Sequence, residues 1–470
     1  DGYDYIWYKE NGTTYYMRST SNEGSGPILS FTTNQYNVGT KWSFHRYTGD
    51  PIDGIGRLNF KYDLILGEAY EHKAYMYSST IGRNGPVTYS SGDINIFTVN
   101  SSTGLVAAYG PGSTNIWVSY YGSPHAWGRT ATVGGMCFFR NGSNYITSTG
   151  STMGTSLKLN LFNGNDVQNW EFVYQGEGYY LIKNRNNGYY ITSPSGNIRG
   201  AVITQEALSS AILDQQLWKI MSRNANGTYR IQSKVRVLDG SNLFLGLSGT
   251  NVVQTDPTNS VDWRLPYVNS STIGLEGQQM SNWCWATSSR MFTNHYYAVP
   301  TTRTQVTAVA AVMGSVVNWG GTHTDAIKAV GHYRSNNINS NILNLIGDYQ
   351  KIFEENILLK FIDDGNVVYI ARGWYSASNV RNGGHAYLVY GYTKEIINGN
   401  LEIRYLIRDP YPTVEPIPWD TPTITTGKTH LWSYDTICNG RKTGEDNGIW
   451  DRYVVVTTDY SSETVSPVYN

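Results

Sequence analysis

The stretch GQQMSNWCWATSSRM, residues 277–291, decides the fold of the second half of the chain. From Cys284 onward it reads as a mostly buried helix, because apolar residues recur and no proline occurs before Pro300. Serine and asparagine at 281–282 are favourable at a helix start. The pattern predicts a helix over Trp283–Tyr297 whose first turn carries Cys284, where the helix dipole lowers the pKa of a thiol.

Three further residues, one before Cys284 and two after it, occur in the order that acyl transfer by a thiol requires. His385 lies in NGGHAYLVYGY, whose β-branched and aromatic run predicts a strand facing the helix, and Asp409 ends the strand-like YLIR before a proline. We expect His385 to act as general base and Asp409 to orient its ring. Gln278, six residues before Cys284, is expected to stabilise an oxyanion together with the Cys284 N–H, although its neighbour Gln279 could take that place.

Each of these residues also has a structural interpretation. A lone cysteine between tryptophans is most often a small buried hydrophobe. An aspartate before a proline often caps a turn. The ordered combination of four residues favours the catalytic interpretation. The other histidines of this half lie alone in the sequence, so we expect surface or structural roles for them: His295, His323, His332 and His430.

These segments resemble a known family. QQMSNWCWATS is similar to the nucleophile segment of the papain-like cysteine peptidases, and GGHAYLVYGY followed by IRDP resembles their compact bacterial branch, which includes bacteriocin-processing peptidases. The resemblance implies that Cys284 is the nucleophile, His385 the base, Asp409 the orienting residue and Gln278 the oxyanion-hole side chain. Plant and lysosomal members have Asn at the position of Asp409 and a small residue at that of Trp283. The expected mechanism needs no metal and no cofactor.

Composition limits the classes of partner. The 470 residues predict two or three domains. With 35 basic and 36 acidic residues, the chain has no field that would attract nucleic acid or a membrane. Only 15% of residues are charged, against about a quarter in ordinary proteins, while Gly and Tyr are abundant. Such a neutral, polar and aromatic surface suits an extracellular β-rich protein that meets sugars.

The remaining global features agree with secretion. No stretch approaches the ~18 apolar residues of a membrane span. The chain begins at Asp1 rather than methionine, and we expect a secreted protein whose signal peptide has been removed. Three cysteines cannot form a disulfide framework, and we expect Cys137 and Cys438 to be buried and reduced.

Residues 1–268 show short apolar runs between turn residues, which predicts an all-β region. The clearest unit, 136–268, repeats three times. Each repeat has a strand, a second short run and a tryptophan, and the strands are expected at Asn144–Ser151, Gly188–Gly196 and Asn242–Thr250. The tryptophans, Trp170, Trp218 and Trp263, are spaced 48 and 45 residues apart. This period is typical of three-fold pseudosymmetric β-folds.

Two of these tryptophans lie in Gln168-x-Trp170 and Gln216-x-Trp218. The pattern resembles the QxW repeat of ricin-type β-trefoil lectins, which implies that the tryptophan packs in the core and the glutamine braces the repeat. Such lectins generally hold a sugar hydroxyl with an aspartate after the first strand of a repeat. The corresponding positions here are Thr147, Thr192 and Gly246, so the pattern argues for the fold and not for sugar binding.

Residues 1–135 resemble a more degenerate copy. Strand-like runs at Thr14–Ser21, Ala74–Thr80 and Asn115–Gly122 precede Trp42, Phe97 and Trp127 in the same order, without a QxW pattern. We interpret this region as an irregular β-trefoil, with an unrelated β-sandwich as the alternative.

Beyond residue 268 the pattern changes to α+β. Helices are expected at Trp283–Tyr297, Thr302–Met313, Thr324–His332 and Asp348–Ile362, and strands at Val367–Arg372, Ala386–Tyr392, Glu402–Arg408 and Tyr453–Thr457. Helices followed by an antiparallel sheet are the order of a papain-like domain.

The sequence therefore predicts a multidomain protein: an irregular β-trefoil-like domain over 1–135, a ricin-type β-trefoil over 136–268 and an α+β papain-like peptidase domain over 269–470. Its function is expected to be that of a secreted cysteine endopeptidase acting on protein or peptide substrates, with lectin-like modules that bind glycans. One alternative is a carbohydrate-binding toxin or adhesin with an inert peptidase-like domain. Another is acyl transfer to amines, as in transglutaminases, because the same thioester serves both reactions. All proposed catalytic residues follow residue 277, so a fragment from 269 onward is expected to carry the chemistry.

Overall fold

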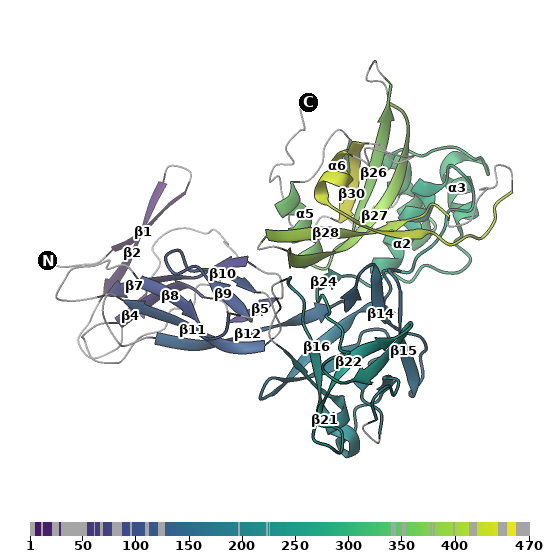
Figure 1. The fold of residues 1–470 in the computed structure, drawn as a ribbon. Coiled ribbons are helices and arrows are strands. Elements are labelled where there is room, and N and C mark those ends of the chain that lie inside the picture. Colours follow the sequence, from purple (N-terminus) through teal and green to yellow (C-terminus); the bar gives the residue numbers. More distant parts are fainter. Residues whose placement is uncertain are drawn as a thin grey trace. The chain divides into compact units, whose positions relative to one another are not determined.

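The computed structural model of the chain describes residues 5–10, 13–20, 28–29, 54–60, 62–65, 69–77, 87–94, 96–108, 112–120, 127–195, 198–221, 224, 226–339, 345–349, 354–376, 378, 381–397, 400–412, 421–439 and 449–456 (Figure 1). The chain divides into two compact units, Asp1–Ile52 and Asp53–Asn470. The first contains an antiparallel sheet in the order β1-β2-β3, with β1 at Tyr5–Glu10, β2 at Thr13–Thr20 and β3 at Ile28–Leu29.

The second unit opens with short strands. They are β4 (Gly54–Asn59), β5 (Asp63–Ile65), β6 (Ala69–Glu71), β7 (Lys73–Tyr77), β8 (Val87–Ser91), β9 (Phe97–Val99), β10 (Leu105–Ala108), β11 (Gly112–Tyr120) and β12 (Trp127–Cys137). β10 pairs with β6 and β9, while β11 joins β8 to β12. The predicted irregular trefoil over 1–135 stays a prediction, since Trp42 and residues 78–80 lie outside the described residues.

The region after β12 contains three hairpins whose first strands coincide with the strands predicted for the three repeats. The strands are β13 (Arg140–Asn141), β14 (Asn144–Ser148), β15 (Thr155–Leu161), β16 (Trp170–Gly176), β17 (Tyr179–Asn184), β18 (Tyr190–Thr192), β19 (Thr204–Glu206), β20 (Leu217–Ile220), β21 (Ile231–Arg236), β22 (Asn242–Ser248) and β23 (Asn251–Thr255). Short helical turns lie at Asp166–Gln168, Ser210–Ile212 and Leu213–Gln216 (α1). The hairpins β14–β15, β18–β19 and β22–β23 meet because β15 also pairs with β19 and with β23.

The core of this region contains the three predicted tryptophans, each fully buried. The indole N–H of Trp170 donates to the carbonyl of Ile146 at 3.1 Å, and that of Trp218 donates to Ile191 at 2.8 Å. Among the described residues the indole nitrogen of Trp263 has no hydrogen-bond partner. The first two repeats therefore share one arrangement, and the third keeps its packing but not its hydrogen bond.

The glutamines of the QxW pattern brace two repeats in the same way. Gln168 Nε2 donates to the hydroxyl of Thr147 and to the carbonyl of Leu161, and its Oε1 accepts from the N–H of Asn163. In the next repeat Gln216 makes the equivalent bonds to Thr192, Ala207 and Ser209. Because Thr147 and Thr192 are buried in these bonds, the positions at which the lectins hold a sugar serve the fold here.

The last part of the chain combines helices with an antiparallel sheet. The helices are α2 (Cys284–Tyr296), α3 (Gln305–Met313), α4 (His323–Ser335), α5 (Glu355–Asp363) and α6 (Tyr434–Asn439). The strands are β24 (Tyr267–Ser270), β25 (Leu345–Tyr349), β26 (Val368–Tyr375), β27 (Arg381–Ile397), β28 (Asn400–Asp409), β29 (Lys428–Trp432) and β30 (Ile449–Val456). The sheet runs β25-β30-β26-β27-β28-β29. The far half of β27 also pairs with β24.

One predicted helix differs from the structure, and some observed elements were not predicted. The helix predicted over Asp348–Ile362 begins only at Glu355, because Leu345–Tyr349 pairs with β30 as a strand. The strand β29 and the helix α6 have no counterpart in the predicted set. Both lie after a stretch rich in proline and threonine, where periodicity gives little signal.

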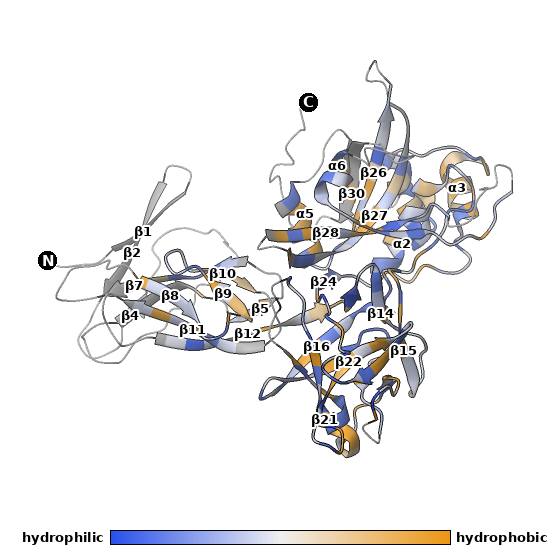
Figure 2. Cartoon of the chain, viewed as in Figure 1, coloured by the Kyte–Doolittle hydropathy of each residue, from blue (hydrophilic) through white to orange (hydrophobic). Residues whose placement is uncertain are grey.

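The hydropathy colouring marks α3, QVTAVAAVM, as strongly apolar (Figure 2), and its Ala308 and Val309 are fully buried.

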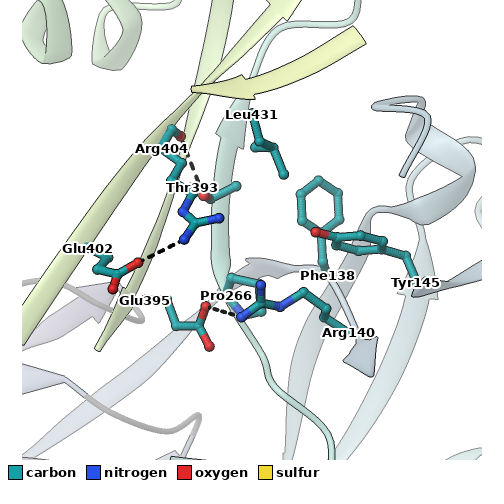
Figure 3. A pocket seen from close by; sticks show the side chains of 9 residues that line it. All are labelled: Phe138, Arg140, Tyr145, Pro266, Thr393, Glu395, Glu402, Arg404 and Leu431. Atoms are coloured by element: carbon teal, nitrogen blue, oxygen red, sulfur yellow. Dashed lines mark hydrogen bonds and ion pairs between the residues drawn. The ribbon is translucent and has the colours of Figure 1, made fainter. Parts of the chain in front are cut away.

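Charged side chains join the trefoil region to the sheet. Glu395 on β27 accepts from Arg140 at 2.7 Å and from Arg264 at 2.9 Å, so two arginines of the repeats share one carboxylate. Figure 3 shows the contact of Glu395 with Arg140, together with the ion pair between Arg404 and Glu402. Three of these charged side chains are less than a third exposed, which makes their interaction stronger than that of a surface pair.

A second connection between the trefoil region and the sheet involves Arg408 and Tyr390. The guanidinium of Arg408, a residue that is 2% exposed, donates to the carbonyls of Gly164 and Ile273, each at 3.0 Å. The hydroxyl of Tyr390 donates to the same Gly164 carbonyl at 2.9 Å. Gly164 has a φ of 63°, and a Cβ there would meet the Tyr390 hydroxyl at 2.5 Å. The loop after the first hairpin of the repeats therefore supplies buried acceptors to the strand that ends at Asp409.

Candidate active site

Helix α2 begins at Cys284 without a side-chain cap. Trp283 occupies the N-cap position, and the expected capping by Ser281 or Asn282 is not found. Asn282 is held elsewhere: its N–H donates to Asn318 Oδ1 and its side chain to the Asn318 carbonyl, both at 2.9 Å. Because the first N–H groups of a helix have no intrahelical acceptor, this start leaves donors and the positive end of the dipole for another group.

The thiol of Cys284 lies between this helix start and strand β27. The side chain is buried with 9% of its surface exposed, and it is hydrogen bonded to His385 and to the backbone N–H groups of Ala386 and Trp285. Burial alone would raise the pKa of the thiol, but the charge of His385 and these hydrogen bonds outweigh it and lower the pKa below its usual value. The site therefore favours a thiolate.

His385 lies on β27, opposite Arg372 of β26. The hydroxyl of Ser288 on α2 donates to the Ala386 carbonyl at 3.1 Å, which ties the helix to the strand next to His385. Burial would lower the pKa of the imidazole, but the charges of Asp409 and Cys284 and the hydrogen bonds to both raise it to about 10. A cationic imidazole beside a thiolate is the ion pair that activates a cysteine nucleophile.

Asp409 ends β28 and is 5% exposed. Its Oδ1 lies 2.7 Å from His385 Nε2 and accepts from the N–H of Tyr411 at 2.8 Å. Burial would raise the pKa of the carboxyl, yet the two histidines bonded to it keep that pKa well below its usual range. Because Asp409 engages Nε2, the other ring nitrogen, Nδ1, is left for the thiol.

A second histidine contacts Asp409, one for which the sequence interpretation expected a surface or structural role. His430 on β29 places Nε2 at 3.0 Å from Asp409 Oδ2, on the side of the carboxylate away from His385. The signal that could have found it is the alternation in KTHLW, Lys428–Trp432, which puts His430 and Trp432 on one face of a strand.

The side-chain amide of Gln278, the expected oxyanion donor, is already hydrogen bonded to backbone carbonyls. Its Nε2 donates to the carbonyl of Ser281 at 2.7 Å and to that of Met280 at 3.2 Å, and the residue is fully buried. Its backbone N–H donates to the Pro410 carbonyl at 2.7 Å. Gln278 thus holds the loop before Cys284 and links it to the segment that follows Asp409.

The other histidines and cysteines have environments of their own. His295 contacts the carbonyl of Gly365 at 2.9 Å, and His332 contacts the hydroxyl of Thr307 at 3.1 Å, as their structural interpretation predicts. Cys137 and Cys438 are buried and free, as expected. Burial raises the pKa of both thiols, that of Cys438 to about 11, so a lowered pKa distinguishes Cys284 from them.

The described part of the chain offers neither a metal cluster nor a membrane-spanning helix. Within it, no group of three or more His, Cys, Asp or Glu side chains is arranged to hold a metal ion. No helix in that part has the length and apolar character needed to span a membrane.

The fold and the site define a chain that joins a lectin-like trefoil to a cysteine peptidase-like domain. Residues 166–259 match the family described as ricin-type beta-trefoil lectin domain-like, and residues 265–432 match the Peptidase_C39 like family. Both resemblances drawn from the sequence are thereby confirmed. No curated protein matches the chain.

Several solved structures are similar to parts of the chain. The designed three-fold symmetric protein ThreeFoil shares 21% identity over 28% of this chain and 96% of its own, with a TM-score of 0.24. The cytolethal distending toxin from Actinobacillus actinomycetemcomitans shares 15% over 28% of this chain and 89% of its own, at 0.22. The Polyporus squamosus lectin, solved with a human-type influenza-binding epitope, shares 14% over 63% and 98%, at 0.27. TM-scores this low carry no functional conclusion.

Proposed function

We propose that the chain is a secreted cysteine endopeptidase whose catalytic residues are Cys284, His385 and Asp409, assisted by Gln278. The observation that carries the proposal is the continuous hydrogen-bonded row from the Cys284 thiol through His385 to Asp409, in which the pKa of the thiol is lowered and that of the imidazole is raised. Opposite shifts of neighbouring groups are characteristic of catalytic pairs.

In the proposed reaction, the Cys284 proton resides on His385, and the thiolate attacks the carbonyl carbon of a peptide bond. The oxyanion that forms accepts hydrogen bonds from the Cys284 N–H and from Gln278 Nε2, which exchanges its longer bond, to Met280, for the substrate. His385 then donates its proton to the leaving amine, and a thioester remains on Cys284. Water, deprotonated by His385, attacks the thioester and releases the acyl product.

The domain layout supports a division of tasks within this proposal. We propose an α+β papain-like arrangement for the peptidase domain, with the thiol on a helix and the base on a facing sheet. The trefoil, and a second one over 1–135, would tether the enzyme to a glycan or cell surface and so raise its local concentration there. Since Thr147 and Thr192 are buried, the glycan would be held by other polar groups of the repeats.

Peptide cleavage is tested by incubating the whole chain with a diverse peptide library and reading the cut sites by mass spectrometry. Wild-type protein should cut and Cys284→Ala should not. Absence of cleavage by wild-type protein that is labelled at Cys284 would refute the endopeptidase assignment. Incorporation of an added amine into the products, in place of hydrolysis, would identify the transferase alternative.

Glycan tethering is tested with the intact Cys284→Ala chain, which keeps every repeat and cannot degrade its target. It should bind members of a glycan array and a cell surface treated with buffer, and lose cell binding after the surface glycans are removed by glycosidases. Binding to neither would refute the tethering role while leaving the peptidase assignment intact.

A further inference from the structure

The carboxylate of Asp409 is occupied on both oxygens. Oδ1 contacts His385 Nε2 at 2.7 Å and accepts from the Tyr411 N–H at 2.8 Å, while Oδ2 contacts His430 Nε2 at 3.0 Å. Asp409 is 5% exposed, so water contributes little to its solvation. A buried carboxylate needs donors on both oxygens, and one of these donors is a histidine for which the proposed mechanism has no task.

The ring of His430 is held by the same aromatic cluster that holds His385. His430 stacks on Trp432, with ring centroids 4.9 Å apart and an angle of 14° between the planes. Trp432 packs edge-on against Tyr387 at 5.1 Å, and Tyr387 packs edge-on against His385 at 4.5 Å. The two histidines therefore lie on either side of Asp409 within one packed group.

The charged groups around His430 come from three strands. Asp409 lies on β28. The guanidinium of Arg372, on β26, lies 4.2 Å from the ring of Trp432, the residue on which His430 stacks. Lys428 on β29 lies 4.7 Å from the ring of Tyr411. Among these groups Asp409 is the one that His430 contacts through hydrogen-bond geometry.

This geometry has a consequence for His385. A carboxylate bonded on one oxygen can rotate about its Cβ–Cγ bond and weaken its bond to the imidazole, whereas a donor on the second oxygen prevents the rotation. A hydrogen-bond donor at Oδ2 also stabilises the buried carboxylate. The carboxylate then remains available to stabilise the imidazolium that His385 becomes.

We propose that His430 is a positioning residue of the active site: by holding Asp409 Oδ2 it fixes the orientation of His385 and maintains the thiolate–imidazolium pair with Cys284. The inference rests on the proposed function for the identity of the reacting pair. It extends the site from three residues to a Cys–His–Asp–His row.

Two substitutions separate the hydrogen bond from the packing. His430→Phe keeps a flat ring against Trp432 and removes the donor. His430→Gln keeps an N–H donor near the position of Nε2 and removes the ring. The first readout is the rate at which iodoacetamide alkylates Cys284 between pH 5 and 9, which reports on the ion pair without requiring hydrolysis. The second is kcat and KM for a peptide cut by the wild-type chain.

We expect His430→Phe to lower alkylation of Cys284 near pH 6 and kcat each by about tenfold with little change in KM, and His430→Gln to retain both within about threefold. Equal rates for His430→Phe and wild type would overturn the inference, as would equal losses in both variants. If His430→Phe does not fold, His430→Asn, whose amide is too short to reach Oδ2, replaces it with the same expectation. Rapid alkylation of wild-type Cys284 without any hydrolysis would instead refute the proposed function alone.

Discussion

The trefoil and the peptidase-like domain bury different kinds of polar group. In the trefoil the buried network is neutral: Gln168 and Gln216 each close a set of amide, hydroxyl and backbone bonds within one repeat. In the peptidase-like domain, charged groups such as Arg408 and Asp409 are buried in addition to neutral ones. Burying charge costs folding free energy unless it is fully paired, whereas a closed neutral network costs little. The difference teaches that the trefoil network maintains a fold, while the charged network maintains a reactive pair.

The largest effect that this comparison predicts is the loss of activity on replacing the nucleophile. Cys284→Ala should lower peptide hydrolysis by about 10⁴-fold or more, and it should change the free energy of unfolding by no more than about 1 kcal/mol. Steady-state kinetics and denaturant unfolding measure the two quantities. Cys438→Ala, at a thiol whose pKa is raised, is the matched control and should stay active. Hydrolysis that survives in Cys284→Ala would move the chemistry elsewhere.

The next effect concerns the separation of the two domains. The contacts at Gly164 revise the expectation that a fragment from residue 269 carries the chemistry alone. Without the repeats, Arg408 and Tyr390 lose the Gly164 carbonyl as acceptor, and each buried group left unpaired costs about 1–3 kcal/mol. We expect the fragment 269–470 to unfold at far lower urea concentration than the fragment 136–470, and to hydrolyse peptide poorly. Equal stability of the two fragments would show that the domains are independent.

A core substitution in the trefoil should have the opposite effects to Cys284→Ala: a loss of stability with little loss of activity. Trp170→Ala removes a fully buried side chain and should lower the free energy of unfolding by about 3–5 kcal/mol. At temperatures where it remains folded, the variant should hydrolyse peptide within about threefold of wild type, since distant sites act nearly independently. Tyr174→Ala, at a side chain that is 39% exposed, serves as control and should be nearly neutral. A loss of activity without a loss of stability would contradict the idea that the trefoil network serves only the fold.

A smaller effect is expected at the residue that orients the base. Asp409→Asn keeps one acceptor oxygen for His385 and should lower kcat by about tenfold, while Asp409→Ala removes it and should cost about a hundredfold. Circular dichroism and kcat measured on both variants check the order. Full activity in a folded Asp409→Ala would mean that another group orients His385.

The mildest effects should appear on changing pH. The pKa of His385 is raised to about 10, so its contribution to stability is complete below the unfolded value of about 6.5 and is lost as pH rises through 10. The pKa of Asp409 is lowered, so its contribution is present above about 4 and is lost in acid. Urea unfolding at pH 7 and pH 10 should show lower stability at pH 10, and His385→Gln should flatten that difference. A difference that is unchanged in His385→Gln would come from other groups.

The repeats could be predicted, and the candidate catalytic residues proposed, because their signals are local. Cys284 and His385 each lie in a short motif, and Gln168-x-Trp170 marks its own repeat. The alternation in KTHLW indicates only the face of the strand on which His430 lies, and its contact with Asp409 depends on the pairing of β28 with β29, which puts Asp409 opposite Lys428.

Contacts between distant segments escaped prediction for a related reason. Arg408 meets Gly164 across a separation of 244 residues, and no local pattern around either residue indicates that contact. The last two residues of β25, Asp348 and Tyr349, were included in a predicted helix because the strand's partner, β30, lies about a hundred residues later in the chain and periodicity is read only over short windows. Local sequence thus indicates the candidate reactive groups, and tertiary pairing determines which groups contact them.

The glycine at the junction limits how such a protein could be recombined. Any side chain at Gly164 would collide with the Tyr390 hydroxyl and the Thr429 methyl group, and its φ of 63° is one that other residues rarely adopt. A lectin domain from another source, grafted in front of this catalytic half, would therefore need the loop Asn163–Asp166 transplanted with it. The practical boundary for building chimeras runs through the first repeat of the trefoil and not along the linker that follows the third.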